Sequence, residues 1–310
     1  MTKKLDHLSF SMYLASLAEM VEAELNRLLP AEDERPEIMH RAMRYSACGG
    51  GKRLRAILVL EAAAICGASR EKALPAGAAI EMLHAYSLIH DDLPCMDDDD
   101  YRRGKLSNHK KFGEGIAVLA GDALLTRTFA VLADLPALIG VSDATALAII
   151  REVADAAGTA GLIGGQAVDL LAEGLAVDNT DNGQNVETLR YIHTRKTGAL
   201  FRAALRTGAA IGGVLPPETR HLDQYSEYFG LAFQITDDIL DVVGDQSKLG
   251  KKVGSDERLQ KLTYPRLFGL EASRRMAEEA VEQALAALAP YGEAAGRLAE
   301  LVVYIGERDR

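Results

Sequence analysis

Apolar residues recur three or four positions apart along most of this chain, a spacing that places them on one face of an α-helix. Residues 8–29 are an example, with apolar side chains at Leu14, Leu17, Val21 and Leu25. No segment of useful length alternates apolar and polar residues as a half-buried strand does. Aromatic residues make up only 5% of the chain, whereas strands draw on aromatic and β-branched residues. We therefore predict an all-α bundle of about ten or more helices.

The helical segments follow one another without a linker or an internal repeat that would divide the 310 residues. We therefore predict a single domain over residues 1–310. Within it, residues 143–172 are expected to be helical throughout, and the polar segment 177–187 is expected to be a loop.

Charge and cysteine content exclude several classes of protein. The net charge of −10 argues against a general nucleic-acid binder, because such proteins carry basic surfaces. Cys48, Cys66 and Cys95 form neither a CxxC pair nor a metal-ligand spacing, so we expect reduced thiols in the cytoplasm. No apolar run approaches the length of about 18 residues that a membrane-spanning helix needs. No apolar segment follows the N-terminal lysines as it would in a signal peptide.

The segment DDLPCMDDDD at residues 91–100 concentrates negative charge at the expected end of a helix. His84 and Asp91 are seven residues apart, so both side chains lie on one face of that helix. Pro94 disfavours a straight continuation. We therefore expect Asp97 to lie where the chain bends back, able to share a cation with Asp91.

A second acidic cluster lies in FQITDDILD, residues 233–241. Asp237 and Asp238 are four and three residues before Asp241, so the three form one acidic face on an otherwise apolar helix. Carboxylates there are costly without compensation, and Mg²⁺ compensates them because it prefers hard oxygen ligands. Magnesium takes one or two carboxylates and completes its shell with water and phosphate. Either cluster alone also fits a solvated surface, but two clusters facing each other would hold a diphosphate through several ions.

Basic residues begin one helix and follow the first acidic cluster. GGGKRLR, at residues 49–55, places Lys52 and Arg55 at a helix start after glycines, where backbone N–H groups and the helix dipole favour anions. Arg102 and Arg103 are adjacent, so their side chains point apart and could serve two anions. The alternatives are a solvated helix start for the first pair and neutralisation of the aspartates for the second.

Three further segments carry polar residues. Lys196 and Thr197 are expected on one helix, where a surface lysine is the alternative. Gln166 and Asp169 share a face of another helix, and a hydrogen bond between helices explains them as well as a substrate contact does. The glycine-bearing loop after the second acidic cluster suits a lid over phosphates. Its lysines are Lys248, Lys251, Lys252 and Lys261.

The chain resembles the trans-isoprenyl diphosphate synthases. It carries, in the family's order, the motifs GGKRLR, SLIHDDLPCMDDDDYRRGK, AGDALL, GGQAVDL, KTGALF, FQITDDILD, GK and KLTYP. The resemblance implies the isoprenoid synthase fold, an all-α bundle around a central cavity, usually in a homodimer. It also implies that isopentenyl diphosphate is joined to an allylic diphosphate with Mg²⁺, in a trio of ions when substrate is bound, for which Mn²⁺ can substitute.

The resemblance implies a role for each matched residue. Metal binding would fall to Asp91, Asp97 and Asp237, with support from Asp92, Asp238 and Asp241. The allylic diphosphate would be held by Arg102, Lys196, Lys251 and, nearby, Lys261. Isopentenyl diphosphate would be held by Lys52, Arg55, His84 and Arg103, and the reacting carbons would face Thr197 and Gln234. One departure is Ala56, where the family's GGKRLRP has proline; we expect it to alter a helix start more than the chemistry.

The implied chemistry starts with ionisation of the allylic substrate. Magnesium and basic groups stabilise the departing diphosphate and leave a carbocation. The double bond of isopentenyl diphosphate attacks this cation, and a proton then leaves to the released diphosphate. An apolar cavity with a basic lid would exclude water, which would otherwise quench the cation.

The residues before Asp91 bear on product length. Tyr86 and Ser87 precede it by five and four residues, and the bulky Tyr86 would form the floor of the cavity. Together with the inserted residues Pro94 and Cys95, this pair resembles short-chain bacterial enzymes that make farnesyl diphosphate, so we favour a C15 product. The segments LPCM and SNHKKFGE also resemble geranylgeranyl synthases, which leaves a C20 product open.

Two other classes remain as alternatives. A non-catalytic regulatory or binding subunit would be expected to lose one aspartate cluster or the pair Lys52 and Arg55, and all of these are present. A terpene cyclase needs only one substrate diphosphate and typically lacks the second cluster in this form. The full set of basic residues on the isopentenyl side therefore favours the synthase.

Overall fold

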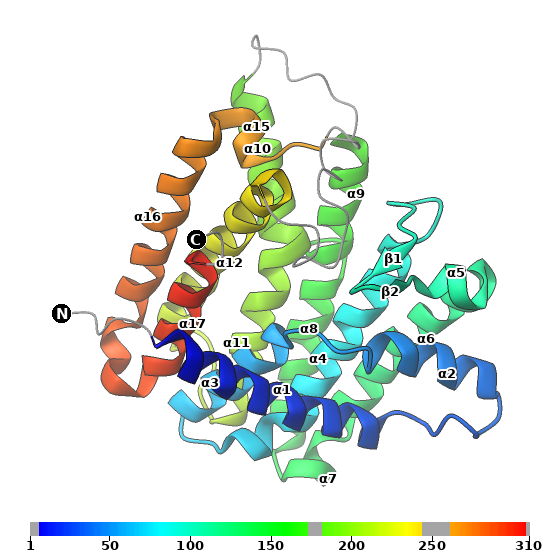
Figure 1. The fold of residues 1–310 in the computed structure, drawn as a ribbon. Helices are drawn as coiled ribbons and strands as arrows, with labels where there is room; N and C mark the ends of the chain where they lie inside the picture. The colour runs from blue at the N-terminus through cyan, green and yellow to red at the C-terminus, as the bar shows by residue number, and fades with distance from the viewer. Residues whose placement is uncertain (1–5, 173–181, 244–260, 308–310) are drawn as a thin grey trace. The chain divides into compact units, whose positions relative to one another are not determined.

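A computed structural model of the protein describes residues 6–172, 182–243 and 261–307, and these residues are largely helical (Figure 1). The all-α prediction is confirmed. Contacts within the chain define two compact units. The N-terminal unit comprises Leu8–Arg151 and Thr207–Gly213, and the C-terminal unit comprises Met1–His7, Glu152–Arg206 and Val214–Arg310. The single domain over residues 1–310 stays a prediction.

Most elements up to residue 151 belong to the N-terminal unit. They are α1 (His7–Leu28), α2 (Glu37–Ala47), α3 (Leu54–Ile65), α4 (Arg70–Asp91), β1 (Tyr101–Arg102), β2 (Lys105–Leu106), α5 (Asn108–Phe112), α6 (Glu114–Ala133), α7 (Leu135–Ile139) and the first part of α8 (Asp143–Ala157). Helix α4 starts after Ser69, whose hydroxyl accepts the Lys72 N–H at 3.2 Å. This N-cap satisfies one of the donors that a helix start leaves unpaired.

The C-terminal unit holds most of the later elements. They are α9 (Leu162–Ala172), α10 (Asn182–Ile192), the π-helix η1 (His193–Gly198), the first part of α11 (Ala199–Ile211), α12 (Arg220–Val243), α15 (Tyr264–Phe268), α16 (Leu270–Leu288), the 3-10 helix η2 (Ala289–Ala295) and α17 (Gly296–Gly306). The boundary between the units falls within α8 and α11.

In the N-terminal unit, α4 packs against α3 and α6 (Figure 1). The contact with α3 is close, because a Cβ added at Gly77 of α4 would lie 3.2 Å from the Cβ of Ala56. Helix α6 is the one described helix that is long and apolar enough to cross a membrane, a test that core helices also pass. Its buried Ala117 and Leu124, together with its packing on α4, are features of a core helix.

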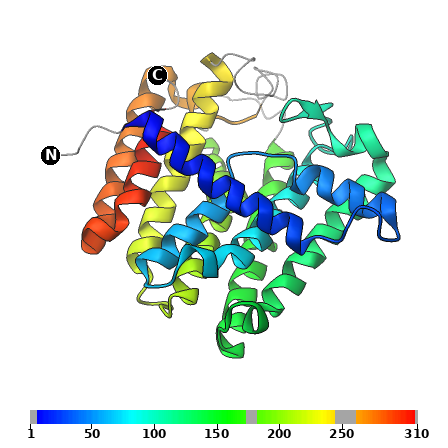
Figure 2. The same cartoon turned by 60° about the horizontal axis from the view of Figure 1, so that its bottom comes forward.

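In the C-terminal unit, α12 packs against α16, α17 and η1. Figures 1 and 2 show the orange α16 and the red α17 beside the yellow part of α12. Phe229 of α12 lies edge-on to Phe201, with ring centroids 5.1 Å apart. The Tyr225 hydroxyl donates to the Leu298 carbonyl at 2.9 Å. The long helix that carries the second acidic cluster is thus fixed along its length.

Two segments differ from what the sequence predicts. The helical run expected over 143–172 is interrupted between α8 and α9, where Gly158 and Gly161 stand and glycine weakens a helix. The expectation of a loop over 177–187 is wrong for its second half, because α10 begins at Asn182, and residues 177–181 lie outside the described residues. That helix ends against η1, so packing on the neighbouring helices outweighs the polar composition.

Candidate active site

The first acidic cluster closes into a turn at the end of α4. The Asp97 N–H donates to the Asp91 carbonyl at 2.9 Å, and the Asp98 N–H donates to the Leu93 carbonyl at 3.2 Å. Asp98 has a positive φ of 49°, a conformation that aspartate tolerates better than most residues. The chain therefore bends back after Pro94 and returns Asp97 to Asp91, as the sequence predicts.

Arg102 reaches back to the same cluster from strand β1. Its guanidinium donates to buried Asp92, through Nε at 2.9 Å and through Nη2, and to Asp99 at 3.2 Å. Burial raises the pKa of Asp92 to about 6, although the charge of Arg102 opposes this shift. The neutralisation considered as an alternative is therefore present, and Asp92 orients Arg102. A role for Arg102 in binding the allylic diphosphate remains a prediction.

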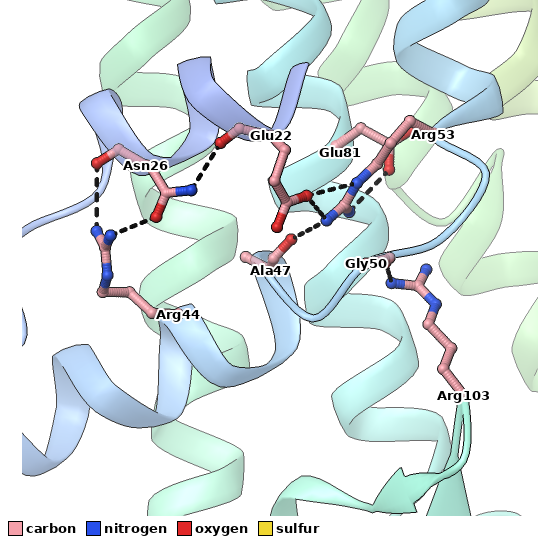
Figure 3. A network of polar contacts seen from close by, with 8 residues as sticks. All are labelled: Glu22, Asn26, Arg44, Ala47, Gly50, Arg53, Glu81 and Arg103. Atoms are coloured by element: carbon pink, nitrogen blue, oxygen red, sulfur yellow. Dashed lines mark hydrogen bonds and ion pairs between the residues drawn. The ribbon is translucent and has the colours of Figure 1, made fainter. Parts of the chain in front are cut away.

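A two-stranded hairpin, which the sequence analysis missed, points the two arginines in different directions. Strands β1 and β2 pair antiparallel, and Arg103 and Gly104 form the turn with φ values of 54° and 75°. Gly104 is the signal that could have revealed it, because tight hairpin turns favour glycine at such positions. The Arg103 side chain donates to the Gly50 carbonyl (Figure 3). A Cβ added at Gly51 would lie only 2.7 Å from the Arg103 guanidinium carbon.

The basic loop at residues 49–55 is anchored by Arg53, which the sequence analysis passed over. Arg53 has a φ of 51° and is 3% exposed. Its guanidinium donates to the Ala47 carbonyl at 2.7 Å and to Glu22 at 3.1 Å, and lies 3.5 Å from Glu81 (Figure 3). The loop is thus tied to α1, α2 and α4 by one buried side chain.

Glu81 also occupies the start of helix α3. Its carboxylate accepts the Ala56 N–H at 3.1 Å in a buried hydrogen bond. Proline, the family residue at this position, would have no N–H to donate. One N–H at this helix start, where the sequence predicts an anion site, is therefore used by the protein's own carboxylate.

Positive charge is concentrated around His84 in the N-terminal unit. Burial lowers the pKa of Arg55 to about 10, with the charge of Glu81 opposing the shift. Burial also lowers the pKa of His84 well below its ordinary value, and Arg55 and Arg103 add to that effect. The buried Nδ1 of His84 has no hydrogen-bond partner, whereas Lys52 is exposed. An anion bound near these groups would relieve the repulsion among them.

Tyr86 and Ser87 are both buried on α4. The Tyr86 ring lies edge-on to His90, with centroids 5.5 Å apart, and burial raises its pKa to about 12. The Ser87 hydroxyl donates to the His84 carbonyl at 2.9 Å, a bond within the helix. Tyr86 is therefore buried and packed against His90, and the Ser87 hydroxyl is hydrogen-bonded within its own helix.

A pocket in the N-terminal unit lies among α2, α4, α5 and the hairpin. Asp92, Arg102 and Arg103 line it, together with Tyr45 and Asn108. The lining from α4 also includes Ala85 and Leu88 but not Tyr86. This pocket is therefore distinct from the cavity floor that the sequence analysis assigned to Tyr86.

The second acidic cluster lies on the continuous helix α12, as predicted. Asp237 and Gln234 are half-buried, whereas Asp238 and Asp241 are buried. Asp238 accepts the Tyr264 N–H at 2.9 Å and so fixes the start of α15. Structural support by Asp238 is consistent with the supporting role that the resemblance implies.

A cluster of charges joins three segments of the C-terminal unit. Lys196 Nζ lies 2.7 Å from the buried Asp169 carboxylate, and Lys261 Nζ lies 3.9 Å from it. Burial alone would raise the pKa of Asp169, but Lys196 and Lys261 bring it below its usual value. Thr197 is buried beside Lys196 on η1, and Lys251 lies outside the described residues.

The carboxylates fit magnesium better than a metal that needs a cage of protein ligands. Among the described residues, no three histidine, cysteine, aspartate or glutamate side chains gather as a metal-binding group. Each predicted set instead offers oxygen ligands in small number: Asp91 and Asp97 in one unit, and Asp237 with Asp238 and Asp241 in the other. Magnesium accepts such a set because water and substrate phosphates complete its shell.

The family model described as polyprenyl synthetase matches residues 36–298. The chain belongs to this family. Farnesyl diphosphate synthase from Escherichia coli is 44% identical over 98% of this chain and 100% of its own length. Geranylgeranyl diphosphate synthase from Cyanophora paradoxa is 44% identical over 88% of this chain and 87% of its own. A crystal structure of an FPP/GFPP synthase from Zymomonas mobilis matches with a TM-score of 0.84 and 38% identity, covering 96% of this chain and 99% of that one.

These matches identify this member of the polyprenyl synthetase family as a trans-prenyl diphosphate synthase. Its family generally uses Mg²⁺ and diphosphate substrates. Relatives of nearly equal identity are named for different products. The length of the product must therefore be argued from individual residues.

Proposed function

We propose that the protein is a farnesyl diphosphate synthase. It would join isopentenyl diphosphate head-to-tail to dimethylallyl and then to geranyl diphosphate, releasing diphosphate at each step. The observation that supports a C15 product is the state of Tyr86, which is 5% exposed and packed edge-on against His90, five residues before Asp91. A bulky side chain held in this way would block further growth of the prenyl chain. The C20 product is the second candidate, supported by the relative from Cyanophora paradoxa.

Magnesium and the allylic diphosphate would be held by the residues that the family resemblance implies. Asp91 and Asp97 would hold magnesium, and Arg102, kept in place by Asp92, would donate to the allylic diphosphate. Asp237 would also hold magnesium, and Lys196 would be a further donor to that diphosphate. Bound magnesium would supply charge neutralisation for the leaving diphosphate.

The isopentenyl side would depend on the basic cluster. Lys52, Arg55 and Arg103 would bind the diphosphate of isopentenyl diphosphate, and neutral His84 would donate one hydrogen bond to it. The allylic C–O bond breaks with its electron pair passing to the departing diphosphate. The double bond of isopentenyl diphosphate then forms the new C–C bond, and its lost proton passes to the released diphosphate. This balance requires no protein base.

We also propose that the protein acts as a homodimer in the cytoplasm. The family resemblance supports the dimer, and the three cysteines, which are free thiols, suit a reducing compartment. Size-exclusion chromatography with light scattering on the active enzyme tests the dimer. A fully active monomer would contradict it.

A product-length assay tests the proposed function directly. The purified protein is incubated with Mg²⁺, labelled isopentenyl diphosphate and dimethylallyl, geranyl or farnesyl diphosphate, and the dephosphorylated products are separated. Products that stop at C15 support the proposal, and a C20 product replaces it with the second candidate. Folded protein that condenses none of these primers would point to a binding subunit.

Asp237→Ala tests the second acidic cluster in the same assay. We expect turnover to fall by at least about a hundredfold, since loss of one group that stabilises developing charge commonly costs that much. Glu227→Ala, an exposed change on the same helix, is the matched control and should keep full activity. An unchanged rate for Asp237→Ala in folded protein would remove this cluster from the mechanism.

A further inference from the structure

Two lysines from separate segments converge on one buried carboxylate in the C-terminal unit. Asp169 of α9 is 9% exposed. Lys196 of η1 donates to it at 2.7 Å, and Lys261, three residues before Tyr264, lies 3.9 Å from it. Lys196 therefore forms a hydrogen bond with Asp169. Lys261 forms an ion pair with it, at a distance too long for a hydrogen bond.

The backbone around Asp169 is built to bring these segments together. Gly165 lies one turn before Asp169, and a Cβ there would be only 2.2 Å from the Lys196 backbone nitrogen. Helix α9 and the π-helix η1 can therefore touch only because residue 165 has no side chain. A π-helical turn is rare in proteins and is frequently found at functional sites.

A second contact ties η1 to the segment that carries Lys261. His193 of η1 stacks on Tyr264, with ring centroids 5.5 Å apart and planes inclined by 28°. The Tyr264 backbone is itself held by Asp238. Both lysines thus project from segments that contact each other through His193 and Tyr264.

The charges of this cluster favour an anion. Asp169 stays ionised, because the two lysines lower its pKa despite burial. Burial lowers the pKa of His193 to about 4, so this side chain is neutral at pH 7. Lys196, Lys261 and Asp169 together carry one net positive charge, and Asp237, whose charge also acts on His193, would be neutralised by magnesium in the proposed function. An ammonium group carries three donors, so a lysine can bond a carboxylate and a phosphate together.

We infer that Asp169 is a positioning residue for the allylic substrate: it holds Lys196 and draws Lys261 beside it, so that the diphosphate meets two ammonium groups already in place. The inference rests on the proposed function, in which Lys196 binds that diphosphate, and on the family resemblance, which implies that Lys261 lies near it. Asp169 itself touches the lysines and not the substrate. Its effect is therefore confined to the allylic side of the reaction.

Steady-state kinetics of Asp169→Asn test this role. Asparagine keeps the size of the side chain and can still accept a hydrogen bond, but it lacks the charge that gathers two lysines. We expect the allylic KM to rise about tenfold, as for the loss of one charge-assisted hydrogen bond, with the KM for isopentenyl diphosphate unchanged. Asp169→Glu, which keeps the charge, should restore most of the affinity. Inorganic diphosphate, tested as a competitor of the allylic substrate, should inhibit Asp169→Asn more weakly than wild type, by a factor similar to the rise in the allylic KM.

Two further variants separate the possible failures. Asp223→Asn is the structural control, because Asp223 bonds Arg206 at 2.7 Å in the same unit; it should lower stability and leave both KM values unchanged. If Lys196→Ala raises the allylic KM and Asp169→Asn does not, the inference is wrong and the proposed function stands. If Lys196→Ala also has no effect, the assignment of the lysine in the proposed function fails.

Lys261→Gln keeps the inference testable if Asp169→Asn does not fold. It removes the second ammonium group without touching the carboxylate, and the same selective rise in the allylic KM is expected. Equal rises in both KM values would assign this region a structural role and overturn the inference.

Discussion

Replacing Glu81 by alanine removes a carboxylate that contacts both the start of helix α3 and the Arg53 guanidinium. Glu81 is 2% exposed, accepts the Ala56 N–H at 3.1 Å and lies 3.5 Å from the Arg53 guanidinium. In Glu81→Ala, the buried Ala56 N–H loses its acceptor. Arg53 keeps Glu22, with which it makes the closer contact, so its charge stays compensated in part.

The size of the effect follows from these two contacts. A buried donor without an acceptor costs about 1–3 kcal/mol, and the weakened ion pair adds a loss below the 3–5 kcal/mol of a fully broken buried pair. We expect a loss of about 3 kcal/mol in all. For a chain of 310 residues, each kcal/mol shifts Tm by about 1.5 °C. The expected fall in Tm is therefore about 5 °C.

Two matched variants divide this loss between the contacts. Ala56→Pro deletes the N–H and leaves Glu81 beside Arg53, and it adds ring atoms at a fully buried position that packs against Gly77. The lost hydrogen bond to a charged group, about 1.5–3 kcal/mol, is offset in part by the restricted unfolded chain, about 0.4–1 kcal/mol. A net loss of at least about 1 kcal/mol is therefore expected. Glu81→Gln keeps an acceptor for Ala56 and should lie between wild type and Glu81→Ala.

Differential scanning calorimetry of the wild type, Glu81→Ala, Ala56→Pro and Glu81→Gln measures these shifts in Tm. Glu37→Ala is the control, because Glu37 forms an exposed ion pair with Arg41, and its loss should change stability by less than about 1 kcal/mol. An unchanged Tm for Glu81→Ala would refute the reasoning. If Glu81→Gln leaves Tm unchanged, the charge of Glu81 has no part in holding Arg53.

Three further predictions concern product length, substrate binding and acid stability. Tyr86→Ala should extend the product from C15 to C20 in the chain-length assay, and Ser87→Ala should not; the same C15 product from both would count against Tyr86 as the floor. Gly51→Ala should raise the KM for isopentenyl diphosphate about tenfold, because a Cβ there meets the Arg103 guanidinium and φ is +122°; an unchanged KM would show that this approach is dispensable. His193 has a pKa lowered to about 4. Between pH 6.5 and 4 this histidine is therefore protonated in the unfolded protein but neutral in the folded protein, and the free energy of unfolding falls as pH drops. From pH 7 to 4.5, denaturant unfolding of wild type should therefore lose about 2 kcal/mol more than His193→Gln, and equal losses would contradict the assignment.

Much of the secondary structure and part of the site follow from local rules. The apolar spacing predicts α1 and α12 because only one helix face needs burial. Pro94 predicts the turn that returns Asp97 to Asp91. Two elements escape such rules. The hairpin at Arg103 is too short for an alternating pattern, and η1 differs from an α-helix only in its packing and hydrogen bonds.

The sequence by itself determined the helical fold class, the face shared by Asp237 and Asp241, and the motif set that marks the family, because each depends on residues close together in the chain. Tertiary structure alone decided which charges meet. Arg53 finds a partner 31 residues away in Glu22, and Lys196 finds one 27 residues away in Asp169. A buried charge needs a partner of opposite charge. The packing of helices decides which partner lies nearby, and that packing depends on the whole chain.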